Sequence, residues 1–205
     1  MIVGIADLGI GNFAAMDKML VQLGATPRRL THPNMLADID RLILPGVGAF
    51  DFAARQLDET GWREPLESFI SQGHRPLLAV CVGMQLLVTG SDEGAGAGLN
   101  WIPGHCRKLV SPKDSPIKVP HMGWNALSVL RDDSLLDEFD RKQRFYFVHS
   151  YYVQCPSSFV LAECQYGLSF PAVIRRESTW GVQFHPEKSH GFGLNLLRNF
   201  LKFSC

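Results

Sequence analysis

Short apolar runs alternate with amphipathic stretches along the first half of the chain. Residues 2–6 (IVGIA) are apolar and lead into residues 7–12 (DLGIGN), which contain two glycines, and apolar side chains then recur at helical spacing as far as Gly24. This order predicts a strand, a glycine turn and a helix. Short strands are predicted next at residues 28–30 and 41–44, because each is bounded by proline or glycine, as in a parallel sheet wound through helices.

The same alternation continues through the middle of the chain. Residues 64–72 predict a helix, residues 76–80 (PLLAV) predict a buried strand, and residues 83–89 predict another helix. Residues 94–98 (GAGAG) are the one flexible-looking segment, and their composition predicts a mobile loop.

Prolines interrupt the pattern between residues 101 and 130, which favours short antiparallel strands inserted into the main arrangement. The predicted elements beyond this insertion are strands at residues 145–149, 160–164, 172–176 and 180–184 and a final helix at 193–203. We therefore expect one α/β domain covering residues 1–205, with a mixed, mostly parallel sheet, flanking helices and a small antiparallel insertion.

The composition shows no strong bias toward charged partners. The 205 residues can form one sizeable core, 46% of them are hydrophobic, and 20 basic and 20 acidic side chains give a formal net charge of +0. This balance provides no overall field to attract nucleic acid or an anionic membrane. The first residues lack the basic region of a signal peptide, and no apolar run approaches membrane-spanning length.

The five cysteines lie far apart in the sequence, at positions 81, 106, 155, 164 and 205. Their odd number and wide spacing match neither a zinc site nor a disulfide framework. We expect free thiols in a reducing cytoplasm, and the sequence implies neither a metal nor a cofactor.

Cys81 stands between small residues at the end of the predicted buried strand and before a predicted helix. This order is typical of a nucleophile elbow, in which a sharp turn lifts the side chain above the sheet and the helix N–H groups favour a thiolate. The segment alone would fit a buried structural cysteine equally well, because cysteine is commonly buried.

A second strand end carries His185, Pro186 and Glu187, directly after the apolar residues 181–184 (GVQF). A histidine at the carboxyl edge of the same sheet can accept the Cys81 proton, and Glu187 can hold its ring in the required tautomer. A capped loop histidine is the simpler interpretation of this segment by itself. It does not account for a glycine-bounded cysteine at another strand end.

Residues 45–48 (PGVG) follow the predicted strand at 41–44 and present backbone with little side-chain obstruction. A main-chain N–H in such a segment can approach a substrate oxygen closely, which suits an oxyanion hole formed by Val47 or Gly48. The N–H of Val82, directly after the candidate nucleophile, is the natural second donor. A plain tight turn would explain the glycines alone.

Together these segments resemble the class I (triad) glutamine amidotransferases and, within them, the glutaminase subunits of imidazole glycerol phosphate synthase. Residues 81–85 (CVGMQ) and 184–187 (FHPE) are shared with the wider class. More specific to these subunits are the segments 45–50 (PGVGAF), 120–125 (PHMGWN), 145–151 (FYFVHSY) and 188–189 (KS). Ala79 and Val82 stand where the family usually has glycine and leucine, and neither departure removes a reacting group.

The resemblance implies a reaction. Cys81 would attack the carboxamide of glutamine, His185 would move the proton, and Glu187 would orient His185. Water would then hydrolyse the thioester to glutamate, and ammonia would leave. The positions implied to bind glutamine are Gly48, Gln85, Glu93, His149, Ser150 and Tyr151, and those implied to face the partner and its ammonia entrance are Asn12, Met122, Trp124, Asn125, Tyr146 and Lys188.

The implied partner is a separate (β/α)8-barrel cyclase, which would form a heterodimer with this chain. It would use ammonia to make imidazole glycerol phosphate and an aminoimidazole carboxamide ribonucleotide in histidine biosynthesis. Three alternatives remain open from the sequence: a paralogous glutaminase that serves another synthase, such as one for surface-sugar amidination, a catalytically silent scaffold that binds a partner, and a cysteine hydrolase of another amide.

Overall fold

The computed structural model describes residues 1–114, 116–140 and 142–204; Cys205 lies outside them. The α-helices are α1 (Phe13–Gln22), α2 (Phe50–Glu59), α3 (Arg63–Gln72), α4 (Val82–Leu86) and α5 (His190–Lys202). Four short 3-10 helices are described, η1 (Pro33–Asp38), η2 (Ser134–Leu136), η3 (Ser157–Phe159) and η4 (Pro186–Lys188). Within this part of the chain, every helix is too short or too polar to span a lipid bilayer.

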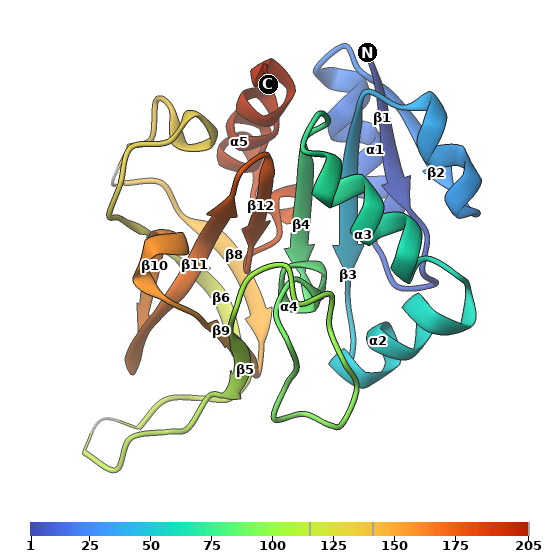
Figure 1. The fold of residues 1–205 in the computed structure, drawn as a ribbon. Coiled ribbons are helices and arrows are strands. Elements are labelled where there is room, and N and C mark those ends of the chain that lie inside the picture. The colour runs from blue at the N-terminus through green and yellow to red at the C-terminus, as the bar shows by residue number, and fades with distance from the viewer. Residues whose placement is uncertain (115, 141, 205) are drawn as a thin grey trace.

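The main sheet of the described residues has eight strands in the order β2-β1-β3-β4-β12-β11-β10-β7. Neighbours from β2 to β12 pair in parallel, and those from β12 to β7 pair antiparallel. The strand bounds in this order are Thr26–Leu30, Ile2–Ala6, Arg41–Gly46, Leu77–Cys81, Thr179–Val182, Leu168–Arg176, Val160–Tyr166 and Ser128–Val129. Figure 1 shows β4 and β12 near the middle of the molecule, with α4 beginning at the lower end of β4.

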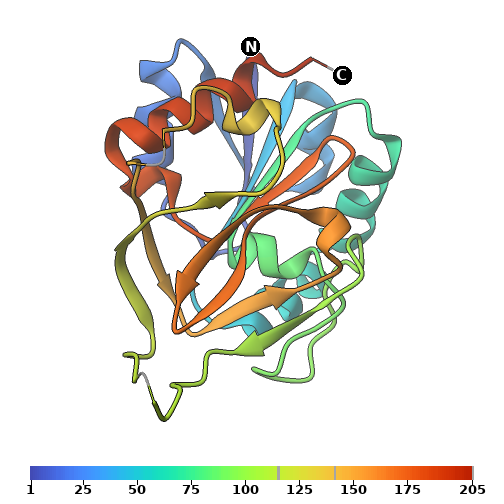
Figure 2. The ribbon, with the colours of Figure 1, turned by 90° about the vertical axis from the view of Figure 1, so that its left-hand side faces the viewer.

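Two small antiparallel sheets complete the fold. One pairs β5 (His105–Lys108) with β9 (Tyr151–Gln154), and the other pairs β6 (His121–Asn125) with β8 (Phe145–His149). Figure 2 views the molecule from this antiparallel side, with β10 and β11 in front of the parallel strands. The expected single α/β domain with a mostly parallel sheet and an antiparallel insertion is confirmed.

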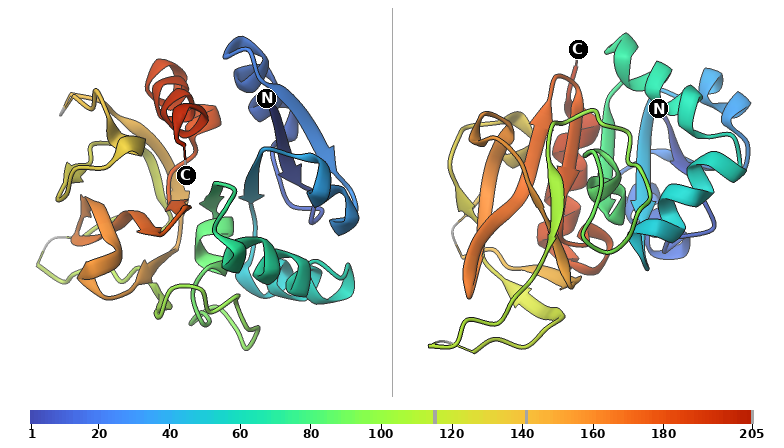
Figure 3. Two further views of the ribbon diagram at one scale, coloured as in Figure 1. Left: turned by 45° about the horizontal axis from the view of Figure 1, so that its top comes forward. Right: turned by 60° about the horizontal axis from the view of Figure 1, so that its bottom comes forward.

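The chain order explains which face of the sheet each helix covers. The step from β1 to β2 runs in one direction along the sheet and the step from β3 to β4 in the other. Because parallel crossovers are right-handed, this reversal places α1 on one face and α2 and α3 on the opposite face, an arrangement visible in Figure 3. Ligands of such sheets bind beyond the carboxyl ends of the strands, near the reversal point.

The adjacent strands β1, β3, β4 and β12 are buried because helices cover both faces of the sheet there. The residues of β3 and β4 are buried along their whole length. Leu20 of α1 and Leu57 of α2 are fully buried. The hydrophobic runs of the sequence therefore correspond to the centre of the sheet, and the amphipathic stretches to the helices that cover it.

Several elements differ from their sequence-based prediction. The helix α2 and the strand β9 were not predicted, and α4 ends at Leu86, before the predicted end at residue 89. The glycine-rich segment 94–98, expected to be a mobile loop, is held by hydrogen bonds. Asp51 accepts from the backbone N–H groups of Ala95 and Gly96, and Arg63 donates to the carbonyl groups that follow.

Candidate active site

The register of the central strands brings three segments together at one edge of the sheet. Gly46 of β3 pairs with Cys81 of β4, and Val80 pairs with Val182 of β12. Cys81 directly follows Val80, and Gln183 directly follows Val182. The two residues therefore lie side by side at the carboxyl ends of adjacent strands. The predicted meeting of the 45–48, Cys81 and 181–187 segments is therefore found in the structure.

Cys81 occupies a sharp turn between β4 and α4. Its backbone has φ +55° and ψ −110°, a conformation that a non-glycine residue rarely adopts. The turn depends on glycine around it: a Cβ on Gly83 would lie 2.0 Å from the carbonyl oxygen of Leu44, and one on Gly46 would lie 2.7 Å from the backbone nitrogen of Gly83. The predicted elbow is present, and it exposes only 3% of the cysteine.

His185 and Glu187 form a buried pair next to this turn. Nδ1 of His185 lies 2.8 Å from Oε1 of Glu187, and the two side chains are 1% and 4% exposed. The backbone N–H of His185 donates to the carbonyl oxygen of Tyr146, which fixes this segment to β8. Burial alone would lower the pKa of His185, but interactions with the Cys81 sulfur and the Glu187 carboxylate outweigh it and raise the pKa to about 9.

The raised pKa favours the imidazolium form of His185 at neutral pH. A cation beside a sulfur can stabilise negative charge that develops on it, and the Glu187 carboxylate compensates for the buried charge on the imidazolium. The arrangement can therefore supply a nucleophile, and a proton for a departing amine.

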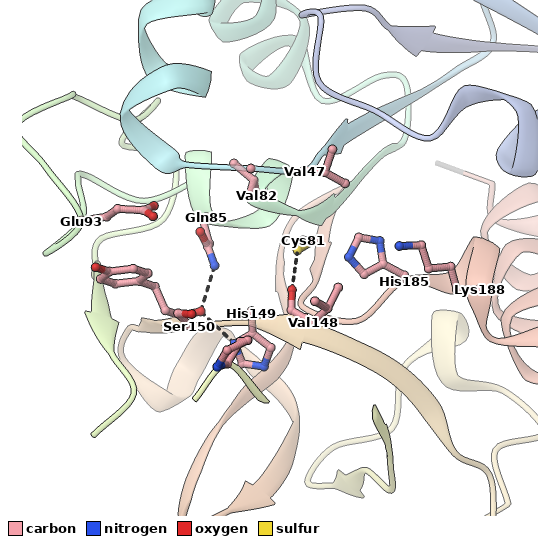
Figure 4. Close-up of a pocket in the computed structure, with 13 residues that line it drawn as sticks. Val47, Cys81, Val82, Gln85, Glu93, Val148, His149, Ser150, His185 and Lys188 are labelled. Atoms are coloured by element: carbon pink, nitrogen blue, oxygen red, sulfur yellow. Dashed lines mark hydrogen bonds between the residues drawn. The ribbon is translucent and has the colours of Figure 1, made fainter. Parts of the chain in front are cut away.

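A pocket of about 350 Å³ opens above Cys81, a size that suits a small molecule. Figure 4 shows Gln85 and Glu93 on one side of Cys81 and His185 and Lys188 on the other. The lining residues are Val47, Gly48, Cys81, Val82, Gln85, Glu93, Pro120, Val148, His149, Ser150, Tyr151, His185 and Lys188. Every residue expected to bind glutamine or form the oxyanion hole is in this set.

Gln85 and His149 meet at one backbone oxygen. Nε2 of Gln85 and Nδ1 of His149 each lie 2.9 Å from the carbonyl oxygen of Tyr151, and both side chains donate to it. Nε2 of His149 lies 3.1 Å from Nδ1 of His121, which is also buried. This network fixes the backbone of the pocket wall at Ser150 and Tyr151.

The histidine pair at this wall is neutral. Burial lowers the pKa of His121 to about 4, and it lowers the pKa of His149 to about 3 against the opposing effect of the Tyr151 carbonyl. Because His149 donates from Nδ1, its Nε2 accepts, and His121 donates from Nδ1.

The Glu93 side chain contacts the N-terminus of helix α2. Its Oε2 accepts from the backbone N–H of Phe50 at 2.6 Å, so the carboxylate satisfies a helix N-terminal donor. The same side chain lines the pocket opposite His185 (Figure 4). Glu93 therefore has a structural contact as well as a position from which it can contact a ligand.

Gly48 has a backbone conformation that favours glycine. Its φ is +101°, and a Cβ at this position would meet no heavy atom within 4 Å. The constraint is therefore conformational and not steric. Val47 beside it is 38% exposed, and both residues line the pocket.

An exposed aromatic patch adjoins the pocket, formed by Met122, Trp124, Tyr146, Lys188 and His190. Met122 and Trp124 are 62% and 46% exposed. Trp124 stacks on His190 with a centroid separation of 5.3 Å and contacts Tyr146 edge-on, and the Lys188 ammonium lies over the Tyr146 ring. Because Lys188 also lines the pocket, the patch and the pocket are continuous at that residue.

The remaining expected interface residues are placed differently. Asn125 binds within the chain, since its Nδ2 donates to the carbonyl oxygen of Gln165. Asn12 directly precedes α1, which packs against η4. Neither residue lines the pocket.

Sequence reasoning missed four residues of the site: Pro120, Val148, His121 and Gln183. The first two line the pocket, and the carbonyl oxygen of Val148 lies 4.0 Å from the Cys81 sulfur. His121 and Gln183 lie within motifs already noted, 120–125 and 181–187, but nothing in the sequence shows that they bond to pocket residues. Among the described residues, no group of three or more His, Cys, Asp or Glu side chains is placed to hold a metal ion.

The family model for class-I glutamine amidotransferases matches residues 5–203 of the chain. The chain is 42% identical over 198 residues to the imidazole glycerol phosphate synthase subunit HisH of Bdellovibrio bacteriovorus, covering 96% of this chain and 97% of that protein. It is 44% identical to the protein of the same name from Salinibacter ruber, covering 96% and 92%.

Solved structures support the same fold. The crystal structure of a glutamine amidotransferase superposes with a TM-score of 0.76 at 20% identity, covering 98% of this chain and 97% of the other. A second glutamine amidotransferase, from Thermotoga maritima, superposes with a TM-score of 0.69 at 14% identity, covering 98% and 96%.

Proposed function

Because the chain belongs to the class-I glutamine amidotransferases, and within them to the imidazole glycerol phosphate synthase HisH subunits, we propose the following mechanism and residue roles for its activity. The chain hydrolyses glutamine to glutamate and ammonia and supplies the ammonia to a cyclase subunit in histidine biosynthesis. The observation that carries the mechanism is the strained turn that places Cys81 next to the buried His185–Glu187 pair, below a pocket.

In this proposal Cys81 attacks the carboxamide carbon of glutamine as a thiolate. His185 gives its proton to the departing nitrogen, so that ammonia leaves and a γ-glutamyl thioester forms. His185 then takes a proton from water, which attacks the thioester and releases glutamate. Glu187 accepts from Nδ1 throughout, which keeps Nε2 of His185 free to carry the moving proton.

The oxyanion formed at each step needs donors from backbone N–H groups. We assign these to Val82 and to the Val47–Gly48 segment, which border the pocket on the side of Cys81. Val82 begins α4, so its N–H has no partner within the helix and is available for a ligand.

The amino acid end of glutamine would occupy the other side of the pocket. Glu93 offers a carboxylate to the α-ammonium group, and the polar groups of Gln85, Ser150 and Tyr151 are within the same lining. His149 contributes indirectly, because its hydrogen bond fixes the Tyr151 carbonyl. This arrangement would orient the substrate amide toward Cys81.

The relatives are named as subunits of a synthase, and we propose that the partner is a (β/α)8-barrel cyclase bound as a heterodimer in the cytoplasm. The aromatic patch is the surface that we assign to it. Asn125 follows Trp124 on β6, and Asn12 precedes the helix that contacts η4. Exposed Met and Trp side chains are typical of interface centres. Since Lys188 belongs to both patch and pocket, ammonia would leave along this residue toward the partner.

Two experiments test the proposal. Glutamate release should be measured for the chain alone and with the protein that co-purifies with it, and identification of that protein decides which synthase receives the ammonia. Trp124→Glu should abolish co-purification. Phe52→Glu is the control and should not, because Phe52 is an aromatic side chain outside the patch that is also exposed, at 40%. Retention of the partner by Trp124→Glu would contradict the assigned surface.

A further inference from the structure

Gln183 is fully buried and contacts the Cys81 sulfur, although it does not line the pocket. Its Nε2 lies 3.7 Å from Sγ of Cys81, and its Oε1 lies 3.2 Å from Nε2 of Gln85. The position follows from strand register, since Gln183 comes directly after the residue paired with Val80. A buried amide beside a reactive sulfur can influence the protonation of that sulfur.

The direction of this amide is determined by the chain of contacts. The carbonyl oxygen of Tyr151 can only accept, so Gln85 turns its NH2 group toward it. The second N–H of the same group faces Gln183, which must therefore present its oxygen to Gln85. The NH2 group of Gln183 consequently points to Cys81, and it can only donate.

The Tyr151 carbonyl is itself held in place. It accepts from His149 as well as from Gln85, and His149 is bonded in turn to His121. A rotation of the Gln183 amide by half a turn would place two NH2 groups against each other and leave its oxygen facing the sulfur. The network therefore favours one orientation at Cys81.

We propose that Gln183 is a positioning residue that donates a hydrogen bond to the Cys81 thiolate, with its orientation fixed by the relay through Gln85 and the Tyr151 carbonyl. The inference rests on the proposed role of Cys81 as the nucleophile. A thiolate accepts more strongly than a thiol, so the bond favours the reactive form and holds the sulfur at one position above the sheet.

The test is the pH dependence of Cys81 alkylation by iodoacetamide in the whole chain, with the signal of a Cys81→Ala variant subtracted. Gln183→Met keeps the size of the side chain and removes its donor. The midpoint of the alkylation rate should move up by about one pH unit, which makes alkylation below the midpoint roughly tenfold slower. In glutaminase assays kcat should fall, while KM for glutamine should stay within about twofold, because Gln183 does not line the pocket.

Gln143→Met is the matched control. Gln143 is also buried, at 8% exposure, and its Nε2 donates to the Glu138 carbonyl, outside the pocket above Cys81. This variant should leave the alkylation midpoint unchanged. A Gln183→Met variant that melts like the control but keeps the parent midpoint would overturn the proposal, and so would a rise in KM alone.

Gln85→Met provides a second route if Gln183→Met does not fold. It leaves Gln183 in place and removes the donor that orients its amide, so the midpoint should rise by a smaller amount. An unchanged midpoint in this variant would also contradict the relay. Because alkylation needs no glutamine and no partner, failure of this inference is distinguishable from failure of the proposed glutaminase activity.

Discussion

Nδ1 of His185 lies 2.8 Å from Oε1 of Glu187, two residues further along the chain and within the same buried segment. Pro186 between them begins the 3-10 helix η4, which turns the chain so that the carboxylate reaches Nδ1 of the ring. A local sequence motif therefore orients the histidine, whereas the approach of Cys81 depends on the pairing of β4 with β12.

Replacing the nucleophile should remove activity without unfolding the chain. Cys81→Ala is expected to lower kcat for glutamine hydrolysis on the order of a millionfold, as loss of a triad nucleophile does elsewhere, while partner binding persists. The matched control is Cys106→Ala, since Cys106 is equally buried but lies on β5. Hydrolysis by Cys81→Ala at the parent rate would show that the nucleophile is misassigned.

Glu187→Gln should lower kcat less than loss of Cys81 or His185 does, by about two orders of magnitude. The reason is that Glu187 orients the base and does not itself react. Removing the anion also disfavours the imidazolium, so the pKa of His185 should fall below its value of about 9. The alkaline limb of the kcat/KM profile should then move to lower pH. A limb at the parent position would mean that Glu187 does not act on His185.

Covalent labelling should single out Cys81. A chloroketone analogue of glutamine reacts with thiolates, and burial raises the pKa of Cys155 to about 11 and of Cys164 to about 12. Those two cysteines remain thiols at neutral pH, as does the deeply buried Cys106, whose pKa is also raised by burial. Peptide mass mapping should find one adduct, and an adduct on Cys155 or Cys164 instead would contradict the assigned site.

Local sequence patterns predicted the parts of this site that are formed by residues close to one another in the sequence. The strand before Cys81, the glycine two residues after it and the His185–Glu187 spacing can each be recognised within a few residues. Helix α2 was not predicted, and its first N–H is bound by Glu93, 43 positions away. Gln183 and His121 were missed for the same reason, since their partners lie on other strands and only the register reveals them.

The neutral pair of His121 and His149 should make the fold sensitive to acid. Their folded pKa values of about 4 and 3 lie below the ordinary value of 6.5, so the unfolded chain binds more protons between these limits. The free energy of unfolding should therefore fall as pH drops below 6.5, by up to about 1.4 kcal/mol per pH unit for each histidine.

Urea unfolding between pH 7 and 4 measures this effect. His149→Gln should reduce the slope of the unfolding free energy against pH by up to the contribution of one histidine, about 1.4 kcal/mol per pH unit. The variant should also be less stable at pH 7, because it loses the hydrogen bonds of His149. His32→Gln, at an exposed position on the surface, should leave the slope unchanged. An unaltered slope in His149→Gln would show that the pair does not titrate as the buried geometry requires.

The last prediction concerns how hydrolysis is coupled to the partner. Ammonia released without an acceptor wastes glutamine, and the Val47–Gly48 peptide can rotate at small steric cost, because Gly48 has no Cβ and the space beside its Cα is open. One missing oxyanion donor costs roughly 3–4 kcal/mol, a factor of about a hundred to a thousand in rate, which is enough for a switch. We expect the chain alone to hydrolyse glutamine slowly, and the partner with its acceptor nucleotide to raise kcat by orders of magnitude.

Gly48→Ala should collapse this ratio of stimulated to basal kcat, because an alanine at φ +101° is strained by about 1–2 kcal/mol and no longer exchanges freely between backbone conformations. Gly61→Ala is the matched control: Gly61 has φ +70°, equally open surroundings and a position between α2 and α3, away from the pocket. It should lose similar stability and keep the full ratio. Steady-state assays of both variants, with and without partner and nucleotide, decide the point. A parent-like ratio in Gly48→Ala would exclude rotation of this peptide as the switch and leave the chemistry of Cys81 untouched.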